Sequence, residues 1–310
     1  MKKLKIGTRG SKLALAQAEV VKAALEKAHS NLTCELKIIR TSGDDFSAGE
    51  NRQDALKGLF VKEIEEALLE GRVDLAVHSV KDMETILPEG LKLAAVLSRG
   101  DPRDALVSRE GRRLKELPAG TRVGASSLRR QAQLRRLRRD LEFVPTRGNV
   151  DTRLKKLDAG EVDALILAAC GLIRLGLSSR ITESLNPEEI LPAPGQGALG
   201  IEIRADRREI EELVEAVDHL ASRQAVEAER AVLRALGGSC RVPIGALAIV
   251  EGETLKLEGV VLSPDGQKAV RKQIAGSRRA AERLGSDLAS HLRAVGADRL
   301  LYGAWATKGN

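Results

Sequence analysis

Short apolar runs and amphipathic helical patterns alternate along the first two thirds of the chain. Apolar runs at residues 4–8, 36–40 and 73–78 have the length of buried strands. Between them, residues 12–28 and 60–70 show the apolar spacing of helices that bury one face. The same order of elements returns further along the chain, with strands expected at 122–125, 141–145 and 162–168 and helices at 128–139 and 151–157.

This alternation predicts the α/β class, with two doubly wound domains whose sheets are parallel and covered on both faces. From about residue 206 the pattern changes to helices at 208–220 and 224–236, strands at 244–250 and 254–262, and a last helix at 277–295. The pattern therefore predicts a domain boundary near residues 99–103 and a separate, smaller α+β domain after about residue 206. Residues 192–200 are read as a crossing between domains or as a simple loop, and the polar stretch 41–57 as a lid or a disordered segment.

Composition narrows the class of protein. The 310 residues include 51 Lys+Arg and 44 Asp+Glu, and 43% are hydrophobic, which excludes a disordered chain. No apolar run reaches the roughly 18 residues of a membrane span, and no signal peptide is recognisable. Three widely spaced cysteines favour a reducing, cytoplasmic location without a disulfide framework or a metal site. Aromatic residues are only 2%, so base stacking by a nucleic-acid binder is not expected.

The positions of the arginines indicate an anionic ligand. Arg129 and Arg130 fall in the first turn of a helix after Ser127, where each cation opposes the helix dipole by up to about 1 kcal/mol. Arg9 and the pair Arg147 and Arg153 lie beside two further helix starts. Solvated surface charge is the alternative for any one of them, but agreement over three strand-end loops favours binding of a polycarboxylate.

Two further segments carry candidate chemistry. Lys81 and Asp82 directly follow a buried strand, where they can bind charge or transfer protons, or form an ordinary surface pair. Cys240 lies in a glycine-bounded loop beside Arg241, whose charge lowers the pKa of a thiol. A hydrolase would also need a histidine base, and a two-lobed anion receptor without chemistry would fit the arginines alone.

Many ordered segments then agree with one family. They are TRGSKLALAQ from Thr8, KGLFVKEIE from Lys57, DLAVHSVKD from Asp74, DPRDALVS from Asp101, GASSLRRQ from Gly124, RGNVDTRL from Arg147, PGQGALGIE from Pro194 and CRVPIG from Cys240. Over nearly its whole length the chain resembles the porphobilinogen deaminases, also called hydroxymethylbilane synthases. Two positions depart from the usual pattern, since Met83-Glu84 stand where Val-Pro is common and Ser239 where glycine is common.

The resemblance implies three domains, which we expect at 1–98 and 195–216 (domain 1), 99–194 (domain 2) and 217–310 (domain 3). Domains 1 and 2 would form a pair of periplasmic-binding-protein-like domains, the smaller α+β domain 3 would carry a covalent dipyrromethane cofactor, and the protein would be a monomer. The resemblance also implies a transferase that joins four porphobilinogen molecules head to tail, releases ammonia at each step, and takes an anionic pyrrole but no nucleic acid, membrane or metal as its partner. Cys240 would hold the cofactor through a thioether, and Asp82 would be catalytic. The remaining cofactor-binding residues implied are Lys81, Ser127, Arg129, Arg130, Arg147 and Arg153. The substrate-binding residues implied are Arg9, Ser11, Gln17, Arg174 and Gln196.

Overall fold

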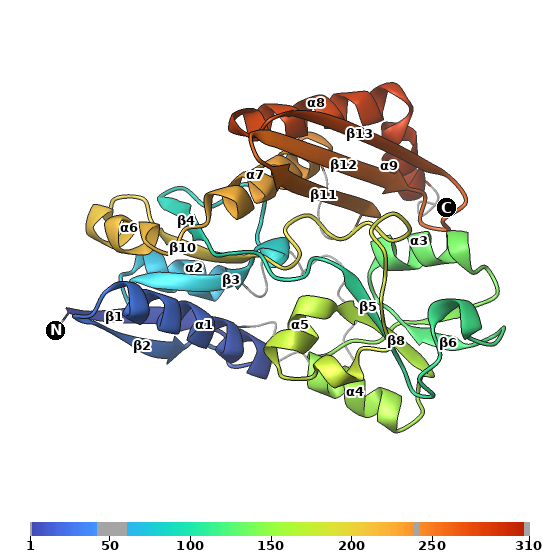
Figure 1. The fold of residues 1–310 in the computed structure, drawn as a ribbon, viewed down its shortest axis with the longest axis horizontal. Helices are drawn as coiled ribbons and strands as arrows, with labels where there is room; N and C mark the ends of the chain where they lie inside the picture. The colour runs from blue at the N-terminus through green and yellow to red at the C-terminus, as the bar shows by residue number, and fades with distance from the viewer. Residues whose placement is uncertain (1, 42–60, 238–241, 307–310) are drawn as a thin grey trace. The chain divides into compact units, whose positions relative to one another are not determined.

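The fold was analysed in a computed structural model that describes residues 2–41, 61–237 and 242–306 (Figure 1). The polar segment expected to form a lid and the residues Cys240 and Arg241 lie outside the described residues. The chain divides into two compact units, the first made of residues 1–99 and 198–223 and the second of residues 100–197 and 224–310. Within the described ranges, none of the helices combines the length and the apolar character that a membrane crossing requires.

The first unit is built on a five-stranded sheet of order β2-β1-β3-β10-β4. Its strands are β1 (Lys2–Thr8), β2 (Leu32–Ile38), β3 (Leu75–Ser79), β4 (Leu91–Val96) and β10 (Leu199–Arg204). Its helices are α1 (Lys12–Ala28), α2 (Lys62–Leu69), α6 (Arg208–Glu215) and the short 3-10 helix η1 (Val80–Asp82). Apolar residues of β1, β3 and β10 pack against α1 and α6 to form the main core of this unit.

Helix α1 shows how the sequence produces these elements. The Oγ of Ser11 accepts a hydrogen bond from the backbone N–H of Ala14 and so caps the first turn. Gln17, Ala18, Val21 and Leu25 then recur at helical spacing and are the buried residues of the helix. The predicted bounds of this helix are confirmed.

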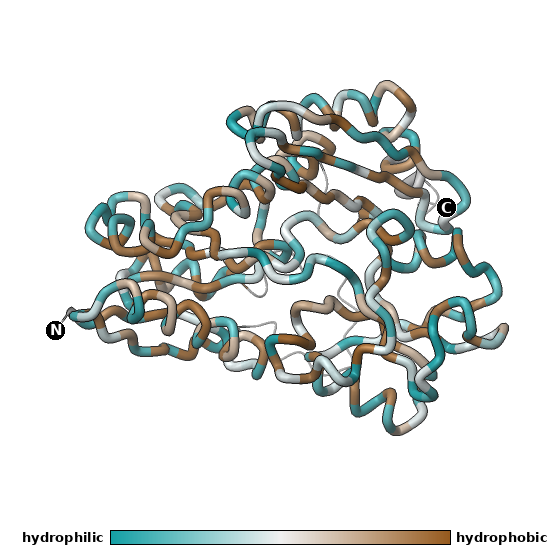
Figure 2. Tube along the Cα trace, in the orientation of Figure 1, coloured by the Kyte–Doolittle hydropathy of each residue, from teal (hydrophilic) through white to brown (hydrophobic). Residues whose placement is uncertain are grey.

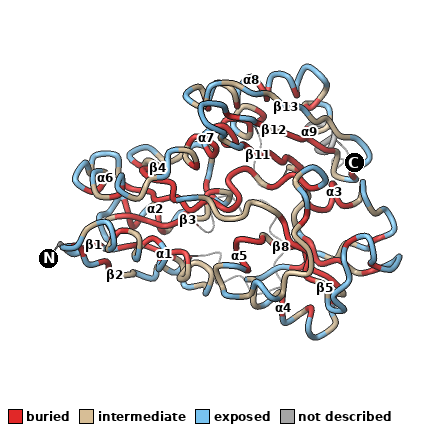
Figure 3. Tube along the Cα trace, in the orientation of Figure 1, coloured by how far each residue is buried: buried red, intermediate tan, exposed pale blue. Residues whose placement is uncertain are grey.

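The second unit contains a sheet of order β7-β6-β8-β5-β9. Its strands are β5 (Asp104–Ser108), β6 (Arg122–Gly124), β7 (Glu142–Val144), β8 (Ala164–Ala168) and β9 (Glu183–Ser184). Its helices are α3 (Leu128–Leu137), α4 (Val150–Asp158), α5 (Ala169–Arg174), η2 (Leu114–Glu116) and η3 (Ser178–Arg180). Strands β5 and β8 are buried along most of their length (Figure 3).

The prediction of purely parallel sheets is wrong, because each sheet contains antiparallel pairs. β10 runs antiparallel to both β3 and β4, and β5 runs antiparallel to both β8 and β9. These two strands are the ones that enter each sheet after the chain has passed through the other unit. A fully buried strand is apolar whichever way it runs, so its hydrophobic pattern does not record its direction.

The C-terminal part of the second unit forms a separate three-stranded antiparallel sheet, β11 (Ile244–Glu251), β12 (Thr254–Leu262) and β13 (Ala269–Ser277). Helices α7 (Leu220–Ala235), α8 (Ala281–Ala294) and α9 (Ala297–Ala306) accompany it, with η4 (Arg278–Ala280) between β13 and α8. This part has its own apolar core, drawn from α7, α8, α9 and the strands. The first half of β12 alternates between polar and apolar residues, whereas β11 is apolar along most of its length (Figure 2). The unit boundary lies inside α7, so the expected three-domain division stays a prediction.

Two contacts join this part to the rest of its unit. Ala132 of α3 and Leu191 share an apolar cluster with Leu247, Val260 and Leu262 of the C-terminal sheet. The fully buried carboxylate of Glu229 on α7 accepts hydrogen bonds from the backbone N–H of Gly195, at 2.6 Å, and of Ala248 on β11, at 2.7 Å.

Several element bounds differ from the sequence prediction. The second strand begins at Leu32 and ends at Ile38, because it pairs with β1 from Lys2 to Thr8. The final helix, expected at 277–295, is α8 and begins only at Ala281, because Ser277 ends β13 and the next three residues form η4. A further helix, α9, follows α8. Strand β13 has three consecutive polar residues, Arg271, Lys272 and Gln273, in its middle and no buried position, which is why no apolar pattern stood out.

Candidate active site

The Lys81-Asp82 pair lies at the carboxyl edge of the first sheet. Strand β3 ends at Ser79 and passes directly into η1, which leaves Asp82 exposed and Lys81 partly buried. The turn is held by backbone hydrogen bonds from Val80 to the carbonyl of Ala198 and from Met83 to the carbonyl of Val80. Met83 is buried at 6% exposure, so this side chain anchors the turn that positions Asp82.

The substrate residues expected in the first unit occupy the same edge. Arg9 and Ser11 follow β1, which is parallel to β3. Gln17 is buried, and its Nε2 donates a 2.8 Å hydrogen bond to the Oγ of Ser79. Gln17 therefore holds the end of β3, and Ser11 caps α1, whatever they also contact in a ligand.

An acidic cluster lies behind this edge. The Nε2 atom of His78 is 3.0 Å from Oε2 of Glu202, and the two side chains are 6% and 0% exposed. Burial raises the pKa of the Glu65 carboxyl, on α2, to about 7, and the negative charge of Glu202 contributes to this increase. Glu84 acts in the same direction, whereas His78 opposes it.

In the second unit, three helices begin where parallel strands end. β6 leads to α3, β7 leads to α4, and β8 leads to α5, so the starts of these helices share one edge of the sheet. Asp104, the first residue of β5, pairs with Ala168, the last residue of β8, and therefore lies at this edge too. The Oγ of Ser126 donates to the carbonyl of Thr146 and accepts from its N–H, which ties the first two of these loops together.

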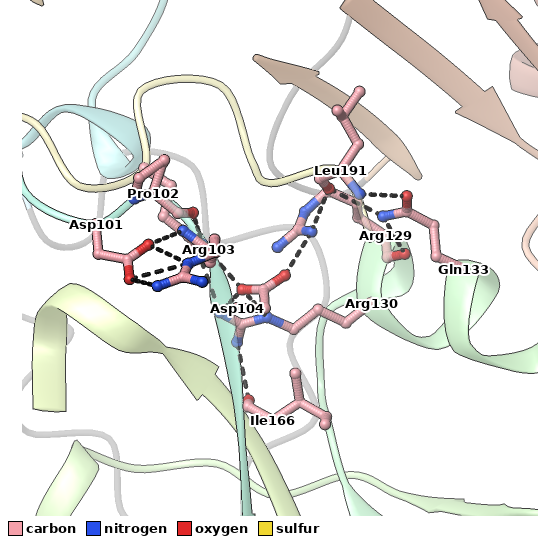
Figure 4. A network of polar contacts seen from close by, with 10 residues as sticks. Asp101, Pro102, Arg103, Asp104, Arg129, Arg130, Gln133, Ile166 and Leu191 are labelled. Carbon is pink, nitrogen blue, oxygen red and sulfur yellow. Dashed lines mark hydrogen bonds and ion pairs between the residues drawn. The ribbon is translucent and has the colours of Figure 1, made fainter. Parts of the chain in front are cut away.

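Arg129 and Arg130 are both buried and both bind Asp104 (Figure 4). Nη1 of Arg129 lies 2.7 Å from Oδ2 of Asp104, and Nη2 of Arg130 lies 2.7 Å from Oδ1. Burial alone would raise the pKa of Asp104, but the charges and hydrogen bonds of the two arginines outweigh it and hold this pKa well below its usual range. Burial also lowers the pKa of Arg129. Two guanidinium groups against one carboxylate leave a net positive charge of one.

The other predicted residues of this unit lie around that cluster. Nη2 of Arg174, at the end of α5, donates a 2.6 Å hydrogen bond to the carbonyl of Gly197, and burial lowers the pKa of its guanidinium. No carboxylate in the described part of the chain forms an ion pair with Arg174. Gln196 is fully buried, and its Nε2 donates to Oδ1 of Asp104 at 2.9 Å. Gln196 thus contacts the Asp104 cluster directly, and Arg174 is bound to the next residue of the chain, Gly197.

Arg147 and Arg153 belong to the loop and helix that follow β7. Arg147 is exposed and makes no hydrogen bond or ion pair with any described residue. Nε of Arg153 donates a 2.7 Å hydrogen bond to the carbonyl of Gly148. Ser127 precedes α3, and its side chain does not cap that helix. None of the contacts described brings these three side chains against the Asp104 cluster.

Sequence reasoning missed Asp104. The arginines at helix starts indicated that an anionic ligand balances their charge. In the structure, the carboxylate of Asp104 balances part of the charge of Arg129 and Arg130. A signal was present, since an aspartate that opens a buried apolar strand must find cationic or hydrogen-bonding partners. Glu202 carries the same signal within the strand Leu199–Arg204.

Two family models of the same family match the chain, one after the other. A family model described as "Porphobilinogen deaminase, dipyromethane cofactor binding domain" matches residues 4–212, and one described as "Porphobilinogen deaminase, C-terminal domain" matches residues 223–294. Among solved structures, a TRAP periplasmic solute binding protein from Desulfovibrio salexigens aligns at 12% identity and a TM-score of 0.43, covering 70% of this chain and 72% of that chain.

Curated relatives are much more similar. A porphobilinogen deaminase from Syntrophobacter fumaroxidans is 50% identical over 298 residues, which are 96% of this chain and 96% of the relative. A porphobilinogen deaminase from Chromobacterium violaceum is 50% identical over 301 residues, with 97% of each chain covered. On these matches to its full length, the chain belongs to the porphobilinogen deaminase family.

Proposed function

We propose that the chain carries out the reaction of its family, the head-to-tail joining of four porphobilinogen molecules into hydroxymethylbilane for tetrapyrrole biosynthesis. Each porphobilinogen carries an acetate and a propionate, so negative charge accumulates as the product lengthens. The observation that carries the proposal is the excess of cations at one edge of the second sheet. There two buried guanidinium groups share one carboxylate, and Arg174 is partly buried without a carboxylate partner in the described part of the chain.

The donor set fits dipyrromethane, which brings carboxylates of the same kind. When bound, this group supplies the pyrrole carbon to which the first substrate molecule is joined. The residue that would attach it is Cys240, which lies outside the described residues. The residues that would bind its carboxylates are Lys81, Ser127, Arg129, Arg130, Arg147 and Arg153. Guanidinium groups suit this task because their parallel N–H groups match the two oxygens of a carboxylate.

Substrate molecules would be bound by Arg9, Ser11, Gln17, Arg174 and Gln196. A binding role for Gln17 and Gln196 has to be compatible with the hydrogen bonds they already make to Ser79 and Asp104. An amide side chain has two N–H donors and an acceptor oxygen, so the bond of Gln17 to Ser79 leaves capacity for a ligand. Gln196 already donates to the carbonyl of Pro102 and to Asp104 and accepts from Arg130, so both of its N–H donors are taken and its role would be to support these neighbours.

Asp82 would stabilise the positive charge that develops when ammonia leaves a substrate molecule. That charge is delocalised through the pyrrole nitrogen, and a carboxylate about 4 Å away is worth about 4 kcal/mol at an effective dielectric constant of about 20. Asp82 is exposed at the end of β3, and the buried Met83 beside it fixes the turn, so its carboxylate can meet a ligand without rearrangement of the sheet. The same carboxylate can accept a proton from the coupled ring carbon.

The covalent attachment is tested by intact-mass measurement of the purified protein. Wild-type protein should be heavier than its sequence by two deaminated porphobilinogen units, and Cys240→Ala should remove the added mass. Cys34→Ala is the matched control, because burial raises the pKa of the Cys34 thiol to about 11 and keeps it protonated. Full turnover by protein without the adduct would refute the proposal, and tight porphobilinogen binding without turnover would identify a receptor.

Asp82→Asn tests the catalytic assignment. The variant keeps the shape and burial of the turn but loses the charge, so we expect a drop in kcat of about a thousandfold if the full electrostatic contribution is made in the transition state. Thermal unfolding should stay close to that of the wild type, since Asp82 is exposed. Glu84→Gln, two residues further along and also exposed, is the control. Near-normal turnover of Asp82→Asn would remove Asp82 from the mechanism.

A cytoplasmic location and a monomeric state are part of the same proposal. Cys34 and Cys170 are both buried free thiols, which is consistent with a reducing compartment. Gel filtration at several protein concentrations tests the monomeric state.

A further inference from the structure

Asp104 is a fully buried carboxylate that no step of the proposed reaction uses directly. It opens β5, the antiparallel strand inserted into the second sheet, and lies at the edge where β8 ends. A lone carboxylate at such a place would be costly to bury, so its retention needs a physical reason.

Four donors from three residues surround this carboxylate (Figure 4). Oδ2 accepts from Nη1 of Arg129 at 2.7 Å. Oδ1 accepts from Nε of Arg130 at 3.0 Å, from Nη2 of Arg130 at 2.7 Å, and from Nε2 of Gln196 at 2.9 Å. Both oxygens are therefore committed, and Asp104 has little capacity left to contact a ligand itself.

These bonds determine which edge of Arg129 remains for a ligand. Nη1 of Arg129 donates to Asp104 and, at 2.7 Å, to the carbonyl of Leu191, which uses both of its hydrogens. The Nε and Nη2 groups of Arg129 make no hydrogen bond to any residue in the described ranges. Together they form the edge of two parallel N–H groups with which arginine binds a carboxylate.

We infer that Asp104 is a positioning residue, which holds Arg129 in the orientation that receives a carboxylate of the pyrrole chain. Arg130 lies beside it with its Nε and Nη2 groups bound to Asp104 and adds positive charge to the same place. This inference rests on the proposed function, since it takes the carboxylates of the pyrrole chain as the ligand. One internal carboxylate makes it possible to bury two guanidinium groups and still leaves the cluster one positive charge for the ligand. A second internal acid would have neutralised the site.

The same unit contains an aspartate–arginine pair of the same chemistry, but more exposed, at the opposite edge of the same sheet. Asp163 precedes β8, and Arg122 is the first residue of β6, so both lie at the amino ends of parallel strands. Nε of Arg122 donates to Oδ2 of Asp163 at 3.1 Å and Nη2 donates to Oδ1 at 3.0 Å. Asp163→Asn breaks an aspartate–arginine fork of the same chemistry far along the strands from the proposed ligand edge.

The experiment uses Asp104→Glu, Asp104→Asn, Arg129→Leu and the double variant of Asp104→Glu with Arg129→Leu. Each protein is produced in cells that cannot make porphobilinogen and is then incubated with porphobilinogen. The first measurement is the rate at which the covalent adduct appears in the intact mass, and the second is KM and kcat of the loaded enzyme. Thermal unfolding confirms that each variant is folded.

Asp104→Glu keeps the charge but displaces it by one methylene group, so a role in stability alone should be largely rescued in this variant. We expect its adduct to form about tenfold more slowly and its KM to rise about tenfold, the factor for loss of one hydrogen bond to a charged group. Because binding of a remote carboxylate is the same in the ground and transition states, kcat should change much less. In the Arg129→Leu background, Asp104→Glu should have little further effect.

Wild-type loading and KM in folded Asp104→Glu and Asp104→Asn would overturn this inference alone, as would fully additive effects in the double variant. Asp163→Asn should load like the wild type, and an equal loss there would overturn the inference by showing a general effect of broken ion pairs. Wild-type protein with neither adduct nor turnover would overturn the proposed function together with this inference.

Discussion

The two sheets of the molecule have the same strand order but opposite surroundings for a buried carboxylate. In β2-β1-β3-β10-β4 and in β7-β6-β8-β5-β9, the fourth strand is the antiparallel one. Each of these strands brings in one carboxylate with no exposed surface, Glu202 in the first sheet and Asp104 in the second. Asp104 is bound by two arginines, whereas Glu202 faces His78 and lies within electrostatic range of Glu65.

The difference shows how one topology supports two kinds of chemistry. The second sheet gathers more cations than anions around its buried acid, and the surplus suits binding of carboxylates. The first sheet gathers acids around a single histidine, behind the edge that presents Asp82. Strand order positions the side chains, and the residue types at a few strand ends decide what the edge can do.

Removing the two buried carboxylates should have unequal effects on stability. Asp104→Asn leaves two buried guanidinium groups without a counter-ion, and arginine does not lose its proton, so we expect a loss of about 3–5 kcal/mol in the free energy of unfolding. Glu202→Gln leaves an amide that can still form a hydrogen bond to His78 and removes a negative charge close to Glu65, so we expect a loss of only about 1 kcal/mol. Urea denaturation of both variants and the wild type measures the difference.

Lys92 and Glu211 form a partly exposed ion pair in the first unit, and Glu211→Gln controls for the loss of any single acid there. Equal losses for Asp104→Asn and Glu202→Gln would show that the two buried acids are supported alike, and the contrast between the sheets would then be wrong.

A smaller effect is expected from Glu65, through pH. Because the pKa of Glu65 is about 7 when folded against about 4.5 ordinarily, the folded state keeps a proton that the unfolded chain has lost. The free energy of unfolding should therefore fall as pH rises from about 4.5 to about 7. Glu65→Gln should remove this part of the pH dependence, so its advantage in Tm over the wild type should be larger at about pH 8 than at about pH 5.

Glu66→Gln, an exposed neighbour on the same helix, should leave the pH dependence of Tm unchanged. The same pH dependence in Glu65→Gln as in the wild type would remove Glu65 from the acidic cluster.

Much of the fold could be predicted from the sequence. The helix Lys12–Ala28 and the strand–helix alternation in both units follow from local periodicity and capping residues. Strands β5 and β10 were not among the expected strands. Their direction could not be predicted either, because pairing with distant strands decides it and a buried strand is apolar in either direction. The short strand β9 (Glu183–Ser184) has too few residues to form a pattern.

The site was predictable in part for the same reason. Arg129 and Arg130 stand out because a cation at a helix start is locally unfavourable, and from this we predicted an anionic ligand. The structure shows an internal carboxylate, Asp104, bound to both arginines. The sequence could not show that Asp104, 25 residues before Arg129, supplies part of the balancing negative charge, since the contact forms only when β5 pairs with β8.

The carboxylate of Glu229 has a consequence for how the C-terminal part of the second unit opens. It links α7 to the backbone of Gly195 and of Ala248 on β11, three stretches that are far apart in the sequence. Both buried N–H groups would lose their acceptor if α7 moved away, so the helix, the strand and the loop are expected to unfold together rather than one by one.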